Sequence, residues 1–268
     1  MALVTIGIPV YNESTYLDET IKSAVSQSLS DIEIIISDNA STDNSVEIAK
    51  KYSKNDPRVR LIQQSENIGC HNNFEFLVHQ ASSPYFVWLG GHDVLEDDYL
   101  EHAFYFLEKH QEAVMAYPKD ACAIGKDGCP VNGAKCSNID TEGIEWPLKR
   151  VGHIAKNLTY CINIHGVFRT DILRKLPFEK VIGPDNLILG MAGIFGHIIG
   201  IDTIGLRVRQ VHNETRSEQK RRWELFGIFE SEKGKDPFKK LIDYHLYHIN
   251  KSTRIGLIDK ILHYNSLR

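Results

Sequence analysis

The sequence shows no excess of basic charge, no long apolar run and no secretion signal. Its 31 Lys and Arg residues are outnumbered by 35 Asp and Glu residues, which gives a formal net charge of −4. Proteins that bind duplex nucleic acid normally carry a basic excess, so that class is not expected here. No window holds the roughly eighteen apolar residues of a membrane-spanning helix, and the opening MALVTIGIPVYNE lacks the basic and apolar regions of a signal peptide. We therefore expect a cytoplasmic protein with at most peripheral membrane contact.

Several common kinds of site are also missing from the sequence. The five cysteines form no Cys-x-x-Cys pair, so neither a disulfide framework nor a zinc site is indicated. The first turn, at residues 9–13, holds neither the Gly-x-Gly-x-x-Gly fingerprint of dinucleotide-binding proteins nor the lysine of a P-loop. A nucleotidyltransferase would need a basic, glycine-rich loop for its triphosphate, and we find none. An anionic ligand would have to be held by local groups or by a metal.

The first hundred residues alternate short β-branched runs with segments of helical period. This alternation predicts an α/β fold with a mainly parallel central sheet flanked by helices. The predicted strands are residues 4–10, 32–37, 59–63 and 85–89. After a helix near residues 99–107 and a strand near 114–117, the pattern becomes irregular to about residue 160. The residues from 185 to about 195 are apolar nearly all round, which indicates a buried helix, and a strand-like stretch follows to residue 212.

Polar residues stand where three of the predicted strands end. Tyr11 and Asn12 follow the first strand, Asp38 follows the second, and His92 and Asp93 follow the fourth. Ligands of open α/β sheets bind beyond the carboxyl ends of the strands. The sequence therefore predicts a binding site at this edge of the sheet.

Four short motifs in this order resemble those of glycosyltransferase family 2. They are IPVYNE at residues 8–13, SDNASTD at 37–43, NIG at 67–69 and an aspartate motif, GHD, at 91–93. The resemblance implies a Rossmann-like GT-A fold and an inverting transferase that uses a nucleotide sugar. It also implies a domain over residues 1–215, with a nucleotide-sugar-binding half (1–117) and an acceptor half (118–215). Residues 216–268 would then form a helical C-terminal extension.

The resemblance also assigns residues to the nucleotide. The Tyr11 ring would stack on the base, and the Asp38 carboxylate would accept a hydrogen bond from a uracil imide N–H, so the expected donor is a UDP-sugar. Asp38 could instead be a turn residue that bonds its own backbone. The full set expected at the nucleotide is Pro9, Tyr11, Asn12, Glu13, Asp38, Asn67, Gly69, His92 and Arg209.

The metal motif departs from the family pattern. Family members normally carry Asp-x-Asp, whose carboxylates hold Mg²⁺ or Mn²⁺ against the diphosphate, whereas residues 91–93 keep only Asp93. The stretch RQVHN at 209–213 resembles the family's late Arg-x-x-His motif, so His212 is the second expected ligand of a Mn²⁺ or Mg²⁺ ion. His212 could also be an ordinary surface histidine.

An acidic residue that opens a helix is the catalytic base in this family, and Asp185 matches that position. Asp185 could also simply cap the helix, and Glu179 is the alternative base. The implied reaction moves a sugar to a hydroxyl of a glycan or a lipid-linked glycan, as in surface polysaccharide synthesis. Because the metal motif is degenerate, a non-catalytic nucleotide-sugar-binding protein is the competing hypothesis.

The C-terminal segment from residue 236 is basic and amphipathic. Such a segment can lie on an anionic membrane, here the inner face of the plasma membrane. Amphipathic helices more often dock on their own domain, and the sequence favours that alternative.

Overall fold

A computed structural model describes most of the chain. The described residues are 1–131, 136–159, 161–179 and 183–209, together with 243, 246–249 and 251 near the C-terminus; the side chain of residue 161 is left out. Nothing below concerns the remaining residues.

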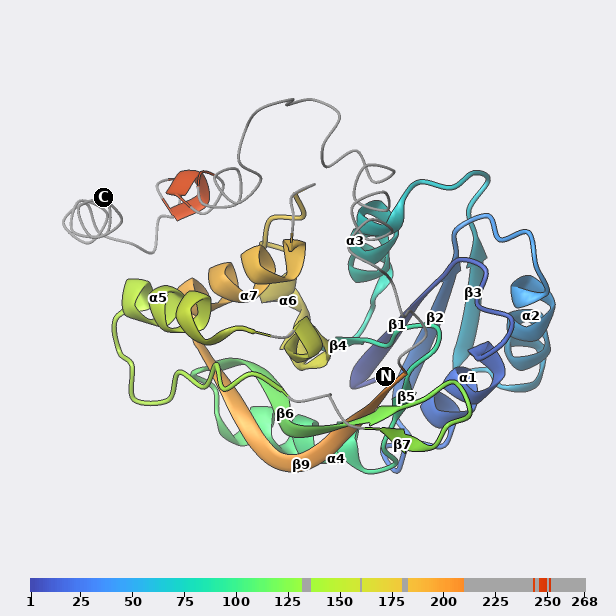
Figure 1. The fold of residues 1–268 in the computed structure, drawn as a ribbon, viewed down its shortest axis with the longest axis horizontal. Helices are drawn as coiled ribbons and strands as arrows, with labels where there is room; N and C mark the ends of the chain where they lie inside the picture. Colours follow the sequence, from blue (N-terminus) through green and yellow to red (C-terminus); the bar gives the residue numbers. More distant parts are fainter. Residues whose placement is uncertain are drawn as a thin grey trace.

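A nine-stranded, strongly curled sheet forms the centre of the molecule (Figure 1). Its strand order is β3-β2-β1-β4-β8-β6-β9-β5, with β7 paired to β6. The strands are β1 (Val4–Val10), β2 (Ile32–Asp38), β3 (Val59–Gln63), β4 (Tyr85–Trp88), β5 (Val94–Leu95), β6 (Ala113–Ile124), β7 (Pro130–Val131), β8 (Val167–Arg169) and β9 (His197–Arg209). The first four strands in this order are parallel, and β6 runs parallel to β9, so the predicted mainly parallel sheet is confirmed.

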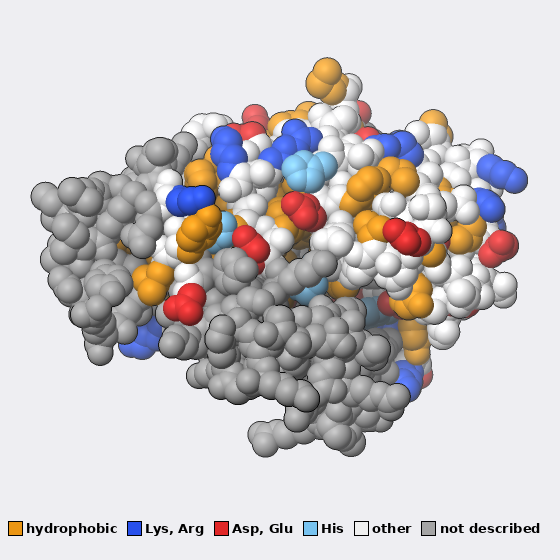
Figure 2. Space-filling model, turned by 90° about the horizontal axis from the view of Figure 1, so that it is seen from above, with side chains coloured by type: hydrophobic (Ala, Val, Ile, Leu, Met, Phe, Trp, Pro, Cys, Tyr) orange, Lys and Arg blue, Asp and Glu red, His pale blue; other side chains and the backbone are white. Residues whose placement is uncertain are grey.

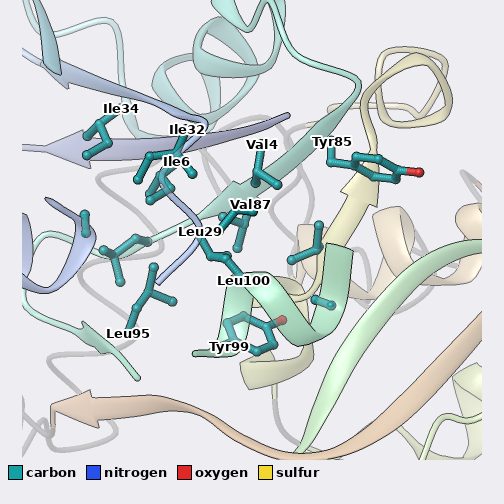
Figure 3. Packing of buried hydrophobic residues seen from close by; sticks show 14 of the residues in the cluster. Val4, Ile6, Leu29, Ile32, Ile34, Tyr85, Val87, Leu95, Tyr99 and Leu100 are labelled. Atoms are coloured by element: carbon teal, nitrogen blue, oxygen red, sulfur yellow. The ribbon is translucent and has the colours of Figure 1, made fainter. Parts of the chain in front are cut away.

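Helices cover both faces of the sheet. They are α1 (Leu17–Val25), α2 (Ser45–Asn55), α3 (Cys70–Gln80), α4 (Tyr99–Lys109), α5 (Pro147–Asn157), the 3₁₀ helix η1 (Cys161–His165), α6 (Thr170–Leu173) and α7 (Pro184–Phe195). One hydrophobic cluster lies between the sheet and α1, α2 and α4, and a second lies between the sheet and α3, α5 and α7. Figure 3 shows part of the first cluster, where side chains of β1, β2 and β4 gather with Tyr99 and Leu100 of α4.

The side chains of β4 alternate between the two hydrophobic clusters. Tyr85 and Val87 belong to the first cluster, and Phe86 and Trp88 belong to the second. Successive side chains of a strand point to opposite faces, so a continuously apolar run is what a strand buried on both faces requires. The neighbouring Gly7 of β1 is needed here, because a Cβ on it would lie 2.5 Å from the Phe86 ring.

The second half of the chain is more ordered than its pattern predicts. The strand expected at residues 114–117 is the twelve-residue β6, and α5 lies within the stretch that looked irregular. Strand β9 is described only to Arg209, so the predicted end of that strand, at His212, and the 215/216 domain boundary both lie outside the described residues.

The described part of the C-terminal segment contacts the rest of the protein. Ile249 is 1% exposed and belongs to the second hydrophobic cluster, and His248 Nε2 lies 3.3 Å from Glu179 Oε1. These contacts agree with the docked alternative for this segment. On the described part of the face in Figure 2, basic and acidic side chains are interspersed. Among the described residues, no helix has the length and apolarity to cross a membrane.

Candidate active site

A cavity of about 870 Å³ opens where β1, β2 and β4 end. Pro9 and Val10 close β1, Asn39 follows β2, and Gly90 to His92 follow β4; all of these residues line the cavity. Residues 67–74, which span the start of α3, line the cavity as well. The cavity thus lies at the carboxyl edge of the parallel strands, where the sequence predicted a ligand site.

The loop after β1 is tied to the loop after β2. Asn12 donates its backbone N–H to Ser41 Oγ at 3.0 Å, and its side-chain oxygen accepts the N–H of Thr42 at 2.8 Å. Asn12 and Ala40 both adopt left-handed backbone conformations, with φ of 57° and 59°. Asn12 therefore braces the two loops and does not line the cavity, whereas the neighbouring Tyr11 does and leaves 48% of its surface exposed.

Asp43 also links the loop after β1 to the loop after β2. Its carboxylate accepts the backbone N–H of Ser14 and of Ser45, both at 3.0 Å. Burial raises the pKa of Asp43, but the hydrogen bonds from Ser45 and Ser14 outweigh burial and lower the pKa from 3.8 to about 2. The ionised Asp43 carboxylate therefore has a structural role: it links Ser14, just before α1, to Ser45, at the start of α2.

Asp38 lies behind the cavity wall at the end of β2, with only 2% of its surface exposed. Oδ2 accepts the N–H of Ser41 at 3.1 Å. This is the bond within its own turn that the alternative role of Asp38 predicts. Oδ1 is buried and has no hydrogen-bond partner within the described part of the chain. A buried carboxylate oxygen without a donor is unusual and calls for a ligand or a water.

Amide side chains form the wall around Asn39. Asn39 donates to Asn67 Oδ1 and accepts the N–H of Ile68, and Asn67 Oδ1 also accepts the N–H of Gly69, each at 2.9 Å. The φ of Gly69 is 85°, which favours glycine. Asn67 and Gly69 line the cavity as expected, whereas Asn39 was missed, although it stands next to Asp38 in the second motif.

The motif turn after β4 contributes His92 to the cavity wall. His92 Nδ1 lies 3.0 Å from Glu13 Oε1, and because a carboxylate only accepts, Nδ1 carries a proton. Burial lowers the pKa of His92, but the hydrogen bond to Glu13 and the charge of Asp93 outweigh burial and raise the pKa above its ordinary value of 6.5. Gly91 permits the pairing, since a Cβ there would lie 2.8 Å from Glu13 Cγ.

Asp93 does not line the cavity, and its side chain is 5% exposed. Its Oδ1 accepts the backbone N–H of Arg209 at 2.9 Å, and its Oδ2 lies 4.0 Å from His165 Nε2. A Cβ on Gly90 would lie 2.6 Å from that same Oδ2. The carboxylate therefore fills the space that a side chain at position 90 would take.

Arg209 is buried and bonded within the protein. Its guanidinium donates to the carbonyl oxygens of His92 (3.1 Å) and Gly125 (3.0 Å) and forms an ion pair with Glu19. It also lies over the Tyr16 ring, 4.5 Å from the ring centroid. Arg209 does not line the cavity, and its contact with the nucleotide stays a prediction.

Only one of the two expected metal ligands lies within the described part of the chain. Within the described ranges, no group of three or more His, Cys, Asp or Glu side chains could hold an ion. Asp93, the expected carboxylate ligand, faces the interior, and His212 lies outside the described residues. No step below is routed through a metal.

Asp185 is the second residue of α7, after Pro184, and does not line the cavity. Gly183, before Pro184, has a left-handed conformation, and the N-cap position makes no side-chain hydrogen bond to the described part of the helix. The partial positive charge of a helix N-terminus favours a carboxylate in its first turn. The alternative base, Glu179, contacts His248.

The sequence profile described as "Glycosyl transferase family 2" matches residues 5–176. The chain belongs to this family. Chondroitin synthase of Escherichia coli is 31% identical over 147 residues, which is 54% of this chain and 20% of that protein. The uncharacterized glycosyltransferase EpsJ of Bacillus subtilis is 37% identical over 103 residues, which is 38% of this chain and 28% of that protein. The chain thus spans less than a third of the length of either relative.

Solved structures resemble the fold over nearly the whole chain. TarS of S. aureus in complex with UDP-GlcNAc superposes with a TM-score of 0.62 at 18% identity, covering 99% of this chain and 79% of that one. The mannosyltransferase PcManGT of Pyrobaculum calidifontis, in complex with GDP-Man and Mn²⁺, gives 0.58 at 14% identity, covering 98% and 79%. At these identities the likeness shows a GT-A-like fold, as the sequence predicted.

Proposed function

We propose that this family 2 glycosyltransferase moves a sugar, with inversion, from a UDP-sugar to a hydroxyl of a glycan or lipid-linked glycan. The observation that carries the proposal is the cavity at the strand ends, which has the exposed ring of Tyr11 on its wall. Behind that wall, Asp38 keeps a buried carboxylate oxygen without a hydrogen-bond partner among the described residues. The UDP-GlcNAc complex of the TarS structure and the chondroitin synthase relative support this donor and acceptor class.

The nucleoside would lie between the loops that follow β1 and β2. Uracil presents an imide N–H flanked by two carbonyl oxygens, so its edge offers the donor that Asp38 Oδ1 lacks. The Tyr11 ring supplies a face for stacking. Asn39 and Asn67, whose amides hold each other, stand beside this position as fixed polar groups. Because Asn12 holds the two loops together, its share in nucleotide binding is indirect.

The transfer needs a base on the acceptor side. Asp185 would take the proton of the attacking acceptor hydroxyl while the oxygen of that hydroxyl forms a bond to the anomeric carbon of the sugar. The bond from that carbon to the phosphate oxygen breaks at the same time, and UDP leaves with the electron pair. Placement in the first turn of α7 favours the ionised carboxylate that this role requires.

The test of this proposal is Asp185→Asn, assayed for sugar transfer from UDP-GlcNAc and for UDP affinity. Loss of a general base should lower turnover by about 10²-fold or more while leaving UDP affinity nearly unchanged. Glu179→Gln is the matched control and should keep wild-type turnover. Wild-type turnover in Asp185→Asn with a loss in Glu179→Gln would move the base to Glu179. UDP binding without transfer in the wild type, over a panel of acceptors, would favour the non-catalytic binding protein.

A further inference from the structure

Helix α3 buries an amide side chain at the turn nearest the cavity. All of α3 is described, and its buried residues are Asn73, Leu77 and Val78. Leu77 and Val78 belong to the second hydrophobic cluster, whereas Asn73, 2% exposed, bonds the end of β2. Its Oδ1 accepts the hydroxyl proton of Ser37 at 2.6 Å, and its Nδ2 donates to the Ser37 carbonyl oxygen at 3.0 Å. Burying an amide costs free energy unless it is bonded, and here both of its polar atoms are bonded to one residue.

Ser37 directly precedes Asp38 and is bonded to a second element as well. It is 0% exposed and does not line the cavity. Gln64, which follows β3, donates its side-chain Nε2 to Ser37 Oγ at 3.2 Å and its backbone N–H to the Asp38 carbonyl oxygen at 2.8 Å. The backbone that carries the Asp38 carboxylate is therefore bonded both to α3 and to the residue after β3.

Asn39 ties the chain down on the other side of Asp38. It is 3% exposed, and its side chain bonds Asn67 and the N–H of Ile68. Both sequence neighbours of Asp38 are thus joined through their side chains to residues 67–73, which line the cavity.

The Asp38 carboxylate has fewer partners than the backbone that carries it. Its Oδ2 accepts the N–H of Ser41, and Oδ1 has no hydrogen-bond partner within the described ranges. A buried oxygen without a donor costs free energy, and a loose strand end would relieve that cost by letting the carboxylate turn toward water. Because the amide bonds hold the strand end, Oδ1 keeps its direction.

A fixed acceptor can distinguish two pyrimidines. Uracil offers an N–H on its Watson–Crick edge, whereas cytosine has an acceptor at the same ring position. Two acceptors that face each other repel, and a site that cannot move must leave its polar group unpaired in the wrong complex. A carboxylate free to turn away would accept both bases more equally.

We propose that Ser37 and Asn73 are positioning residues for the nucleobase, which hold Asp38 so that the donor cavity selects UDP over CDP. The inference rests on the proposed function, since it concerns the contact of Asp38 with uracil. Both polar atoms of the Asn73 amide are bonded to Ser37, so the effect of this pair on the base passes through Asp38.

The experiment is calorimetric titration of the full chain with UDP and with CDP, at one pH and in the presence of Mn²⁺. The wild type should bind UDP about tenfold or more tightly than CDP. Ser37→Ala should reduce this ratio of affinities by about threefold, and Asn73→Ala, which removes both bonds, should reduce it by about tenfold.

Two controls separate positioning from a general loss of stability. Ser83→Ala also removes a buried hydroxyl, which bonds Thr5 at the end of β4 away from the cavity, and it should keep the wild-type ratio even if the protein melts earlier. In an Asp38→Asn background, Ser37→Ala should not change the ratio further, because the residue through which it acts is already altered.

A wild-type ratio in Ser37→Ala would overturn this inference and leave the proposed function intact, whether or not Asn73→Ala folds. A ratio that Ser83→Ala lowers as much as Ser37→Ala does would overturn it too. A wild type that binds UDP and CDP equally, or binds neither, would contradict the nucleotide contact in the proposed function, and this inference with it.

Discussion

Asp38 and Asp93 are both buried carboxylates near strand ends, yet their surroundings differ. Asp38 closes β2 and keeps one buried oxygen without a partner among the described residues. Asp93 follows β4, and its two oxygens face the Arg209 N–H and the His165 ring. A strand-end carboxylate is therefore available to a ligand only where the protein leaves one of its oxygens unsatisfied. Burial and sequence position alone do not distinguish the two cases.

The backbone explains the difference. After Asp38 the chain turns through Ala40 in a left-handed conformation, and among the described residues only the N–H of Ser41 bonds the carboxylate. After β4, the absence of side chains at Gly90 and Gly91 lets Asp93 and Glu13 move into the space beside the turn. The first arrangement leaves one carboxylate oxygen without a partner among the described residues, and the second gives both oxygens a neighbouring protein group.

The largest effect should come from Asp93→Ala. It leaves the buried N–H of Arg209 unpaired and should lower the free energy of unfolding by about 3 kcal/mol, which for a chain of this size lowers the melting temperature by about 5 °C. Asp93→Asn keeps an oxygen for that N–H and should lose about half as much. Thermal unfolding followed by circular dichroism measures both. An unchanged melting temperature in Asp93→Ala would mean that Asp93 does not hold the turn.

Asp38→Asn should act on binding rather than on folding. The substituted amide can present an N–H where the uracil N–H arrives, so UDP affinity should fall about tenfold or more, equivalent to about 1.4 kcal/mol. The melting temperature without ligand should change little, because Oδ1 has no described partner to lose. CDP offers an acceptor at the same ring position, and its affinity should fall less than that of UDP. Equal losses for UDP and CDP would contradict a direct contact with the base.

Gly90→Ala tests how fully Asp93 occupies the turn. The added Cβ would lie 2.6 Å from Asp93 Oδ2, and relief of that contact should cost about 1–2 kcal/mol of unfolding free energy. In an Asp93→Ala background the same substitution should cost much less, since the obstructing oxygen is gone. Urea unfolding of the wild type, the two single variants and the double variant gives the coupling free energy between positions 90 and 93. Strictly additive effects would show that the two positions are independent.

The smallest effect should come from Asp43, whose oxygens are satisfied by protein groups, as those of Asp93 are. Its pKa is lowered from 3.8 to about 2, so its contribution to stability is present above pH 3.8 and is lost as the pH falls through about 2. The difference in melting temperature between the wild type and Asp43→Asn should therefore shrink as the pH is lowered over that range. A difference that stays constant would show that the carboxylate is not titrating in this way.

The sequence predicted the parallel half of the fold well because its signals are local. The continuous apolar runs of β1, β2 and β4 and their turn residues determine the sheet and place Tyr11 and His92 on the cavity wall. It could not show the direction of the Asp93 carboxylate, because that depends on an N–H at Arg209, more than a hundred residues later in the chain. It also missed α5, because the turn-rich stretch before that helix hid its helical period. The placement of Asp185 relative to the donor stays a prediction.

Strand β9 makes a hydrogen bond to a distant segment at each end of its described length. At its first residue His197 Nδ1 bonds the Thr141 carbonyl oxygen at 2.7 Å, and at its last described residue the Arg209 N–H bonds Asp93. Its thirteen residues have a contour length of about 40 Å. A one-residue slip of a strand moves every side chain to the opposite face. A single insertion or deletion within β9 would therefore turn Arg209 away from the turn, so length variation among homologous chains should fall outside this strand.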